Sequence, residues 1–147
     1  METLADIEEV ARTLNRAAEI AAPHGVKVGY HNHSGEFRVV EGKCILDWLM
    51  EKTTENVVME LDIYWAHRGG VDPCDYIEKW GKRVELIHLK QEGENGRNVD
   101  MADGFIDMKR IARAAKYAAY FIVEREQYDK PIMECVKNDI QYLKAIL

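Results

Sequence analysis

Four short apolar segments, spread along the chain, each end in side chains that can bind a metal ion. The clearest is VELIHLK at residues 84–90, and a similar segment, VVMELD, occupies residues 57–62. The other two are VKVGYHNH at residues 26–33 and FIVE at residues 121–124. Apolar runs of this length are typical of buried strands. This repetition constrains the fold more than any other feature of the sequence.

Helical patterns separate these predicted strands. Apolar residues recur every three or four positions over residues 4–21, which predicts an amphipathic helix that ends at Pro23 and Gly25. Further helices are predicted over residues 44–52, from Asp72 and Pro73 onward, and over residues 107–117 and 132–147; residues 63–70 and 91–104 are predicted loops. A helix followed by four strand–helix repeats implies a parallel sheet.

The positions of the polar side chains favour one kind of parallel sheet. His31, Asp62, His88 and Glu124 lie at the ends of four consecutive predicted strands, 26 to 36 residues apart. In an open doubly wound sheet, ligands gather at one crevice, whereas in a barrel every strand end can contribute. We therefore expect an α/β fold of TIM-barrel-like units, with four parallel strands and five helices, which is half of a (β/α)₈ barrel.

Half a barrel needs a covering for its edges. Four strands would leave two unpaired edges and an exposed inner face. A second copy of the chain, a separate partner chain or the rest of a longer protein could complete it, and a homodimer is the simplest arrangement. At 147 residues, the chain is expected to form a single domain over residues 1–147.

Charge and hydropathy exclude several classes of partner. The chain has 20 basic and 26 acidic residues, a net charge of −6, and its basic residues are dispersed, so no nucleic-acid surface is expected. There is no apolar run of membrane-spanning length, and the first residues are acidic, unlike a signal peptide. The expectation is a cytoplasmic protein with no membrane partner.

Five motifs, in the same order along the chain, point to a known family. They are YHNHSGEF at residues 30–37, ELDIYW with GGVDP at residues 60–65 and 69–73, HLK at 88–90, DGFID at 103–107, and VE at 123–124. Together they resemble the C-terminal half of the sugar phosphate isomerase/epimerase family, in the xylose isomerase-like TIM barrel superfamily. Gln91 stands where that family commonly has aspartate, and Arg125 and Glu126 stand where it commonly has glutamine and aspartate.

The resemblance implies one divalent ion, Mn, Mg, Co or Zn, at the C-terminal mouth of the barrel. Its ligands would be Asp62, His88 and Glu124, and the fourth ligand, from the preceding strand, could be His31, His33 or Glu36. Carboxylates and imidazoles suit a divalent ion that keeps a position open for substrate. Each also has a structural alternative: Asp62 could cap a helix or loop, His88 could be a buried packing residue, and Glu124 could pair with Lys90 or Arg125.

A bound ion of this kind polarises a carbonyl and a neighbouring hydroxyl while a base removes the α-proton. Glu124 is the first candidate for both ligand and base. In related epimerases a second glutamate serves the opposite face of the sugar; here His31 or Glu36 would do so, or the reaction would be an isomerisation, a dehydration or another elimination.

Four further residues are candidates for binding substrate or orienting ligands. Lys90 could contact a substrate oxygen or neutralise Glu60 or Glu124, and Trp65 could form a floor for a sugar ring or pack in a loop. His33 is a candidate for the same pocket. Glu60 could orient a ligand histidine or pair with Lys27. The predicted function is a metal-dependent sugar isomerase or epimerase; the alternative is a truncated or split homologue, without catalysis, that binds carbohydrate or a partner chain.

Overall fold

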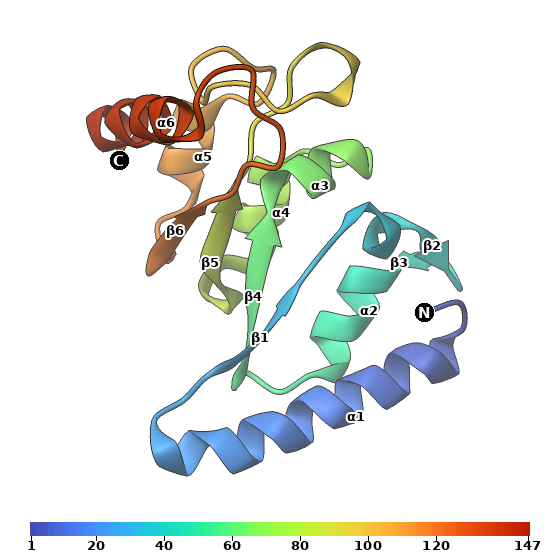
Figure 1. Ribbon diagram of the computed structural model, residues 1–147. Coiled ribbons are helices and arrows are strands. Elements are labelled where there is room, and N and C mark those ends of the chain that lie inside the picture. Colours follow the sequence, from blue (N-terminus) through green and yellow to red (C-terminus); the bar gives the residue numbers. More distant parts are fainter.

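The protein, described over residues 1–147 by a computed structural model, is a four-stranded sheet with helices packed on one face (Figure 1). The prediction of an α/β fold with four parallel strands is confirmed. In chain order the elements are α1 (Leu4–Ala21), β1 (Val28–His31), β2 (Val39–Val40), β3 (Lys43–Cys44), α2 (Ile45–Lys52), β4 (Val57–Asp62), α3 (Ile63–Arg68), α4 (Pro73–Trp80), β5 (Val84–Leu89), α5 (Met108–Ala114), β6 (Tyr120–Val123) and α6 (Ile132–Ile146).

The four main strands are parallel in the order β1-β4-β5-β6, so each strand lies next to its nearest predecessor in the main sheet. Strands β2 and β3 form a separate antiparallel pair. Alternate residues of the main strands point away from the inner face and into the core. Met59, Leu61 and Ile87 are fully buried there, with Met50 of α2 and Ile111 of α5 in the same cluster.

The first helix begins and ends at residues suited to those positions. Thr3 caps α1 by accepting a hydrogen bond from the Asp6 N–H, and the Asp6 carboxylate accepts from the Thr3 N–H in return. Beyond α1, a 3-10 turn ends at Gly25, which has a left-handed φ of 68°. The chain then turns into β1, as the sequence predicted.

The structure has one helix more than the five predicted. Residues 63–70 were expected to form a loop, but Ile63–Arg68 is the helix α3, because Asp62 accepts a hydrogen bond from the Trp65 N–H and Ile63 is fully buried. Two other elements have a boundary that differs by two residues or more. The strand expected over residues 26–33 is shorter, Val28–His31, and the helix expected over residues 107–117 ends at Ala114.

An irregularity in the pairing of β4 with β5 brings two candidate ligands side by side. Met59 pairs with Val84, but Glu60 pairs with Leu86, so one residue of β5 is skipped. Asp62 is therefore opposite His88. A regular register would place Asp62 opposite Ile87, whose side chain points into the core, because successive side chains in a strand alternate between the two faces.

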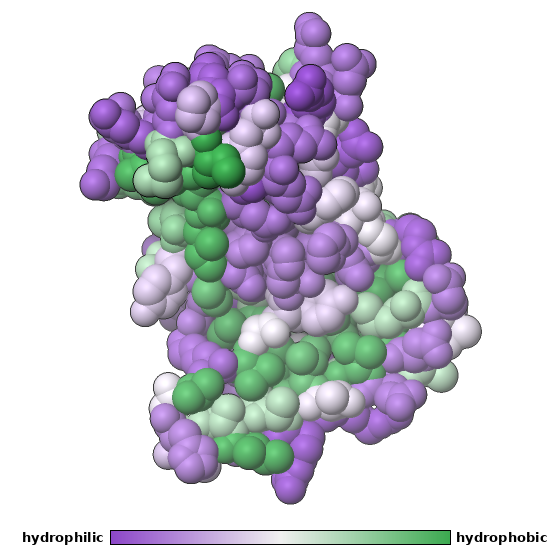
Figure 2. Space-filling view, in the orientation of Figure 1, coloured by the Kyte–Doolittle hydropathy of each residue, from purple (hydrophilic) through white to green (hydrophobic).

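The inner face of the sheet is open. No helix crosses in front of β4 and β5 in Figure 1, and Leu86 and Ile122 on this face are only half-buried. Figure 2 shows a hydrophilic centre with hydrophobic surface beside α1 and beside β6. Ile20 at the end of α1 and Val26 before β1 are exposed. An exposed inner face with two edge strands is what half a barrel would present. None of the helices is long and apolar enough to cross a membrane.

Candidate metal centre

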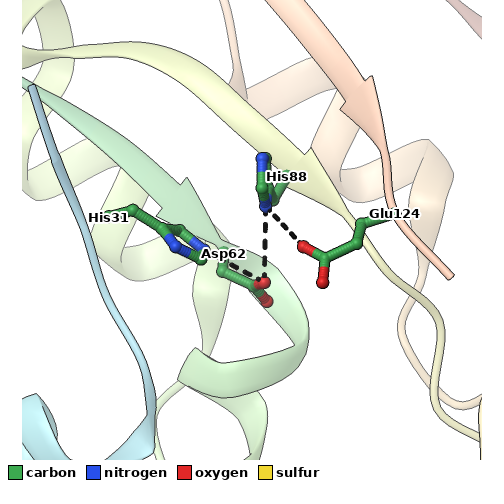
Figure 3. A group of neighbouring side chains, drawn as sticks. All are labelled: His31, Asp62, His88 and Glu124. Atoms are coloured by element: carbon green, nitrogen blue, oxygen red, sulfur yellow. Dashed lines mark hydrogen bonds and ion pairs between the residues drawn. The ribbon is translucent and has the colours of Figure 1, made fainter. Parts of the chain in front are cut away.

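Four side chains from four strand ends meet at the C-terminal edge of the sheet (Figure 3). One potential ligand atom from each of His31, Asp62, His88 and Glu124 lies within 4.8 Å of the others. They come together because parallel strands end at the same edge and because the shifted register aligns Asp62 with His88. The sequence had singled out these four residues. Their role as ligands remains a prediction.

Asp62 uses its two carboxylate oxygens for different purposes. Oδ1 accepts the hydrogen bond from the Trp65 N–H at 2.9 Å and caps α3. Oδ2 faces the centre, 3.3 Å from His31 Nε2 and 3.8 Å from His88 Nδ1. The side chain is fully buried. Asp62 is therefore both the helix cap considered as the alternative and a member of the group.

A residue that sequence reasoning missed, Asn32, fixes the backbone of Asp62. Its side-chain Oδ1 accepts from the Asp62 N–H at 2.9 Å, and its Nδ2 donates to the Asp62 carbonyl at 3.3 Å. Asn32 is fully buried. It lies between His31 and His33 in the motif HNH, and an amide side chain next to a ligand candidate was the only signal in the sequence.

The two ring nitrogens of His88 have different surroundings. Nε2 lies 3.0 Å from Glu60 Oε1, which orients the ring. Nδ1 is buried and lies 2.7 Å from Glu124 Oε2 and 3.8 Å from Asp62 Oδ2, but neither of these charge contacts has the geometry of a hydrogen bond. A buried nitrogen aimed at two carboxylates without a hydrogen bond fits a metal ligand, since a cation between these atoms would satisfy all three. The donor set of two imidazoles and two carboxylates suits a divalent ion such as Mn²⁺ or Zn²⁺.

Charges in the group lower the pKa of Asp62 and raise that of His88 when no cation is present. Burial acts to raise the pKa of Asp62, but His31, His88 and the Trp65 N–H together outweigh it and lower that pKa. Neighbouring carboxylates, Asp62 foremost, raise the pKa of His88 above its ordinary value of 6.5, against the effect of its burial.

These shifts predict how metal binding depends on pH. The raised pKa of His88 stabilises the metal-free fold below pH 6.5, and this contribution is lost as the pH rises through the raised value. Since a metal ligand must be neutral imidazole, we expect apparent Mn²⁺ affinity to increase from about pH 6 to about pH 8, with protons released on binding. Calorimetry in two buffers of different ionisation enthalpy measures the release. An affinity that is constant over this range would contradict ligation by His88.

The other two candidates for the first-strand ligand lie outside the group. The His33 ring packs against the rings of Trp65 and His31, with centroids 5.4 and 5.1 Å apart. Glu36 accepts from the His33 N–H at 2.7 Å and from the Tyr30 hydroxyl at 3.1 Å, so both of its oxygens are engaged. Of the three candidates, only His31 lies in the metal group. The rings of His33 and Trp65 lie beside His31, and the Glu36 carboxylate is bonded within its own turn.

Lys90 is completely enclosed. Its amino group lies 2.9 Å from Glu126 and 3.5 Å from Glu124, above the rings of Tyr64 and Trp65. Its side chain has no exposed surface even though the inner face of the sheet is open. It neutralises the two glutamates, and in this arrangement it reaches a substrate only if Glu126 moves. Glu126 is a second residue that the sequence did not single out for the centre.

Glu60 has the partner expected of an orienting residue. The alternative, an ion pair with Lys27, is not formed, because Lys27 pairs with Glu85 at 2.5 Å. The skipped residue in the β4–β5 register is this Glu85, since Glu60 pairs with Leu86. Glu60 is thereby left free to contact His88.

Comparisons with known proteins agree with the fold described above. The sequence model of the xylose isomerase-like TIM barrel family matches residues 2–146. An inosose dehydratase from Geobacillus kaustophilus is 39% identical over 84 residues, covering 56% of this chain and 27% of that protein. Another, from Clostridium perfringens, is 30% identical over 140 residues, covering 80% of this chain and 46% of that protein.

Among solved structures, a sugar phosphate isomerase/epimerase from Parabacteroides distasonis superposes with a TM-score of 0.85 at 29% identity. The match covers 99% of this chain and 54% of that one. The chain thus spans about half the length of the proteins that it matches over most of its residues.

Proposed function

The chain belongs to the xylose isomerase-like TIM barrel family, and we propose from this premise that it supplies the metal-binding half of a sugar isomerase or epimerase. The reaction would be a proton transfer next to the carbonyl of a sugar or keto-sugar. The single observation that carries the proposal is the meeting of His31, Asp62, His88 and Glu124, with the buried His88 Nδ1 left without a hydrogen bond.

The proposed roles follow from the contacts of each residue. A divalent ion bound by these four side chains would polarise the carbonyl and an adjacent hydroxyl of the substrate. Glu124 is half-buried and adjoins the open inner face, so its carboxylate can also take a proton from the neighbouring carbon. His31 lies on the opposite side of Asp62 from Glu124 and is the candidate for the second proton-transfer group.

Aromatic and polar side chains beside the centre support a sugar as the substrate. Trp65 and His33 pack against each other next to His31, and apolar faces of a sugar ring pack well on such rings. The charge of the chain, −6, continues to argue against a nucleic acid.

A second candidate reaction, dehydration, is favoured by the relatives. The two curated proteins described above are inosose dehydratases. A dehydration begins with the same step, removal of the proton next to the carbonyl by Glu124, and continues with loss of a hydroxyl from the next carbon as water. The same metal centre would support either reaction, and the structure of the substrate would determine which one occurs.

The proposal includes a partner for the open face. Because the matched proteins are about twice as long, we propose that residues 1–147 form one domain that works with a second half-barrel, either from another copy in a homodimer or from a different chain segment, in the cytoplasm. The alternative is a chain without catalysis that uses the centre and the open face to bind a carbohydrate or a partner protein.

Hydrogen exchange in D₂O tests the catalytic proposal directly. With Mn²⁺ present, the protein should replace the proton next to the carbonyl of its keto-sugar by deuterium, and NMR of a panel of ketoses and keto-inositols would detect this. Glu124→Gln should slow exchange by about 10²- to 10⁴-fold, because it removes the base while keeping the shape of the side chain.

The matched control is Glu85→Gln, a glutamate of the same sheet that pairs with Lys27 outside the metal group and should leave exchange unchanged. If the wild-type protein exchanges no substrate of the panel but binds one of them in the presence of Mn²⁺, the binding alternative replaces the catalytic proposal.

A further inference from the structure

The segment that follows β6 alternates between two environments. Glu124 and Glu126 point to Lys90, on the side of the metal group. Arg125 lies between them in sequence and points elsewhere, into the space between two loops and α6, where its side chain is 2% exposed. Whatever holds Arg125 therefore also fixes the backbone from which Glu124 projects.

All three guanidinium nitrogens of Arg125 have partners. Nη1 donates to Asp100 at 2.5 Å and approaches Asp139 at 3.5 Å, Nη2 donates to Asp129 at 3.0 Å, and Nε donates to the Gln127 carbonyl at 2.9 Å. We call Arg125 and the three aspartates the Arg125 clamp. Its members come from the loop after β5, the loop after β6 and α6, so it ties three parts of the chain together at the mouth of the sheet.

The clamp depends on the charge and shape of arginine. Asp139 is fully buried and accepts a hydrogen bond from the Met101 N–H, and burial raises its pKa. Asp100 is also held by Lys130 and Asn138; burial acts to raise its pKa, but the bonds from Arg125 and these two residues lower it to about 2. A planar group with a fixed fork of donors can serve several carboxylates at once, which a neutral amide cannot.

A second cluster of potential metal ligands is occupied by the positively charged side chains of Arg125 and Lys130. Asp100, Asp129 and Cys135 lie close enough together to hold an ion, but Arg125 and Lys130 already occupy the two aspartates. The cluster is therefore a structural ion-pair network rather than a second metal centre.

We propose that Arg125 is a positioning residue for the metal centre: the Arg125 clamp fixes the Glu124 carboxylate against His88 and Asp62. The inference rests on the proposed function, because it requires Glu124 to be a metal ligand. It assigns a role to one of the positions where this chain departs from its family's common pattern.

Mn²⁺ titration by calorimetry, on the wild type, Arg125→Gln, Glu124→Gln and the double variant, tests the inference. Arg125→Gln should weaken Mn²⁺ binding about 10- to 100-fold, as loss of an outer partner of a ligand does. In the double variant the two losses should not multiply: its affinity should lie within about twofold of that of Glu124→Gln alone, because both changes remove the same ligand.

The matched control is Arg83→Gln. Arg83 also has a partner for each of its three guanidinium nitrogens, in Val57, Met50 and Thr53, but at the opposite end of the sheet. It should lower stability and leave Mn²⁺ affinity unchanged. If circular dichroism shows that Arg125→Gln does not fold, Asp100→Asn replaces it in the same comparison. This variant weakens one bond of the Arg125 clamp, so the expected loss of Mn²⁺ affinity is smaller.

The outcomes separate this inference from the proposed function. Wild-type affinity in a folded Arg125→Gln, or losses that multiply in the double variant, would overturn the positioning role while leaving the metal centre in place. A wild-type chain that binds no Mn²⁺ would overturn the metal centre and the positioning role together.

Discussion

Asp62→Asn removes tight metal binding and leaves the fold intact. The substitution keeps an oxygen where Oδ1 caps α3, and asparagine is as good a helix cap as aspartate. At the other position it replaces the charged Oδ2, the atom that faces both histidines, with a neutral group. We expect Mn²⁺ affinity to fall by more than about 100-fold, since loss of an outer partner of a ligand alone costs about 10- to 100-fold. Calorimetric titration measures it.

The control for this variant is Asp72→Asn. Asp72 caps α4 through a hydrogen bond from the Cys74 N–H, as Asp62 caps α3, but its other oxygen pairs with Arg110 outside the metal group. It should bind Mn²⁺ as the wild type does. Equal affinities in the two variants would mean that Asp62 serves only as a cap.

Asn32→Ala lowers both stability and metal affinity. It leaves the N–H and the carbonyl of Asp62 without their side-chain partner in a fully buried place. Because an unsatisfied buried polar group costs about 1–3 kcal/mol, we expect the free energy of unfolding to fall by about 2–4 kcal/mol. The freed backbone also lets Oδ2 of Asp62 move away from the histidines, so Mn²⁺ binding weakens. Urea denaturation and metal titration measure the two effects.

Asn15→Ala is the matched control for Asn32→Ala. Asn15 makes the same kind of paired bonds, donating to the Lys52 carbonyl and accepting from the Thr54 N–H, but it is half-buried and lies near the start of β4, at the opposite end of that strand from Asp62. Because water can replace its bonds, it should cost about 1 kcal/mol and leave metal binding unchanged. If Asn32→Ala were no more harmful than Asn15→Ala, the positioning of Asp62 by Asn32 would be refuted.

The four members of the metal group could be predicted because the signal is local. Each lies at the end of an apolar run, and the alternation of strands with helices implies that parallel strands end at one edge. The choice among His31, His33 and Glu36 could not be made in the same way. It depends on where β1 ends and on Glu36 bonding within its own turn, and both are settled by packing.

Other features depend on contacts between distant segments. The shifted register that aligns Asp62 with His88 arises from the pairing of β4 with β5. Nothing in the sequence of either strand predicts this shift. The extra helix α3 forms because Asp62 caps it. The sequence offered capping and a place in the centre as alternatives for Asp62, and did not indicate that one side chain would do both. The Arg125 clamp joins Arg125 to aspartates up to 25 positions away along the chain, so its members appear as ordinary surface charges in the sequence.

The most direct test of the metal centre is anomalous diffraction from crystals of the wild-type protein grown with Mn²⁺, with data collected at the manganese edge. The account predicts one strong peak enclosed by His88 Nδ1, Asp62 Oδ2, Glu124 and His31. A map with no peak there, or with its peak between Asp100 and Asp129 instead, would contradict it.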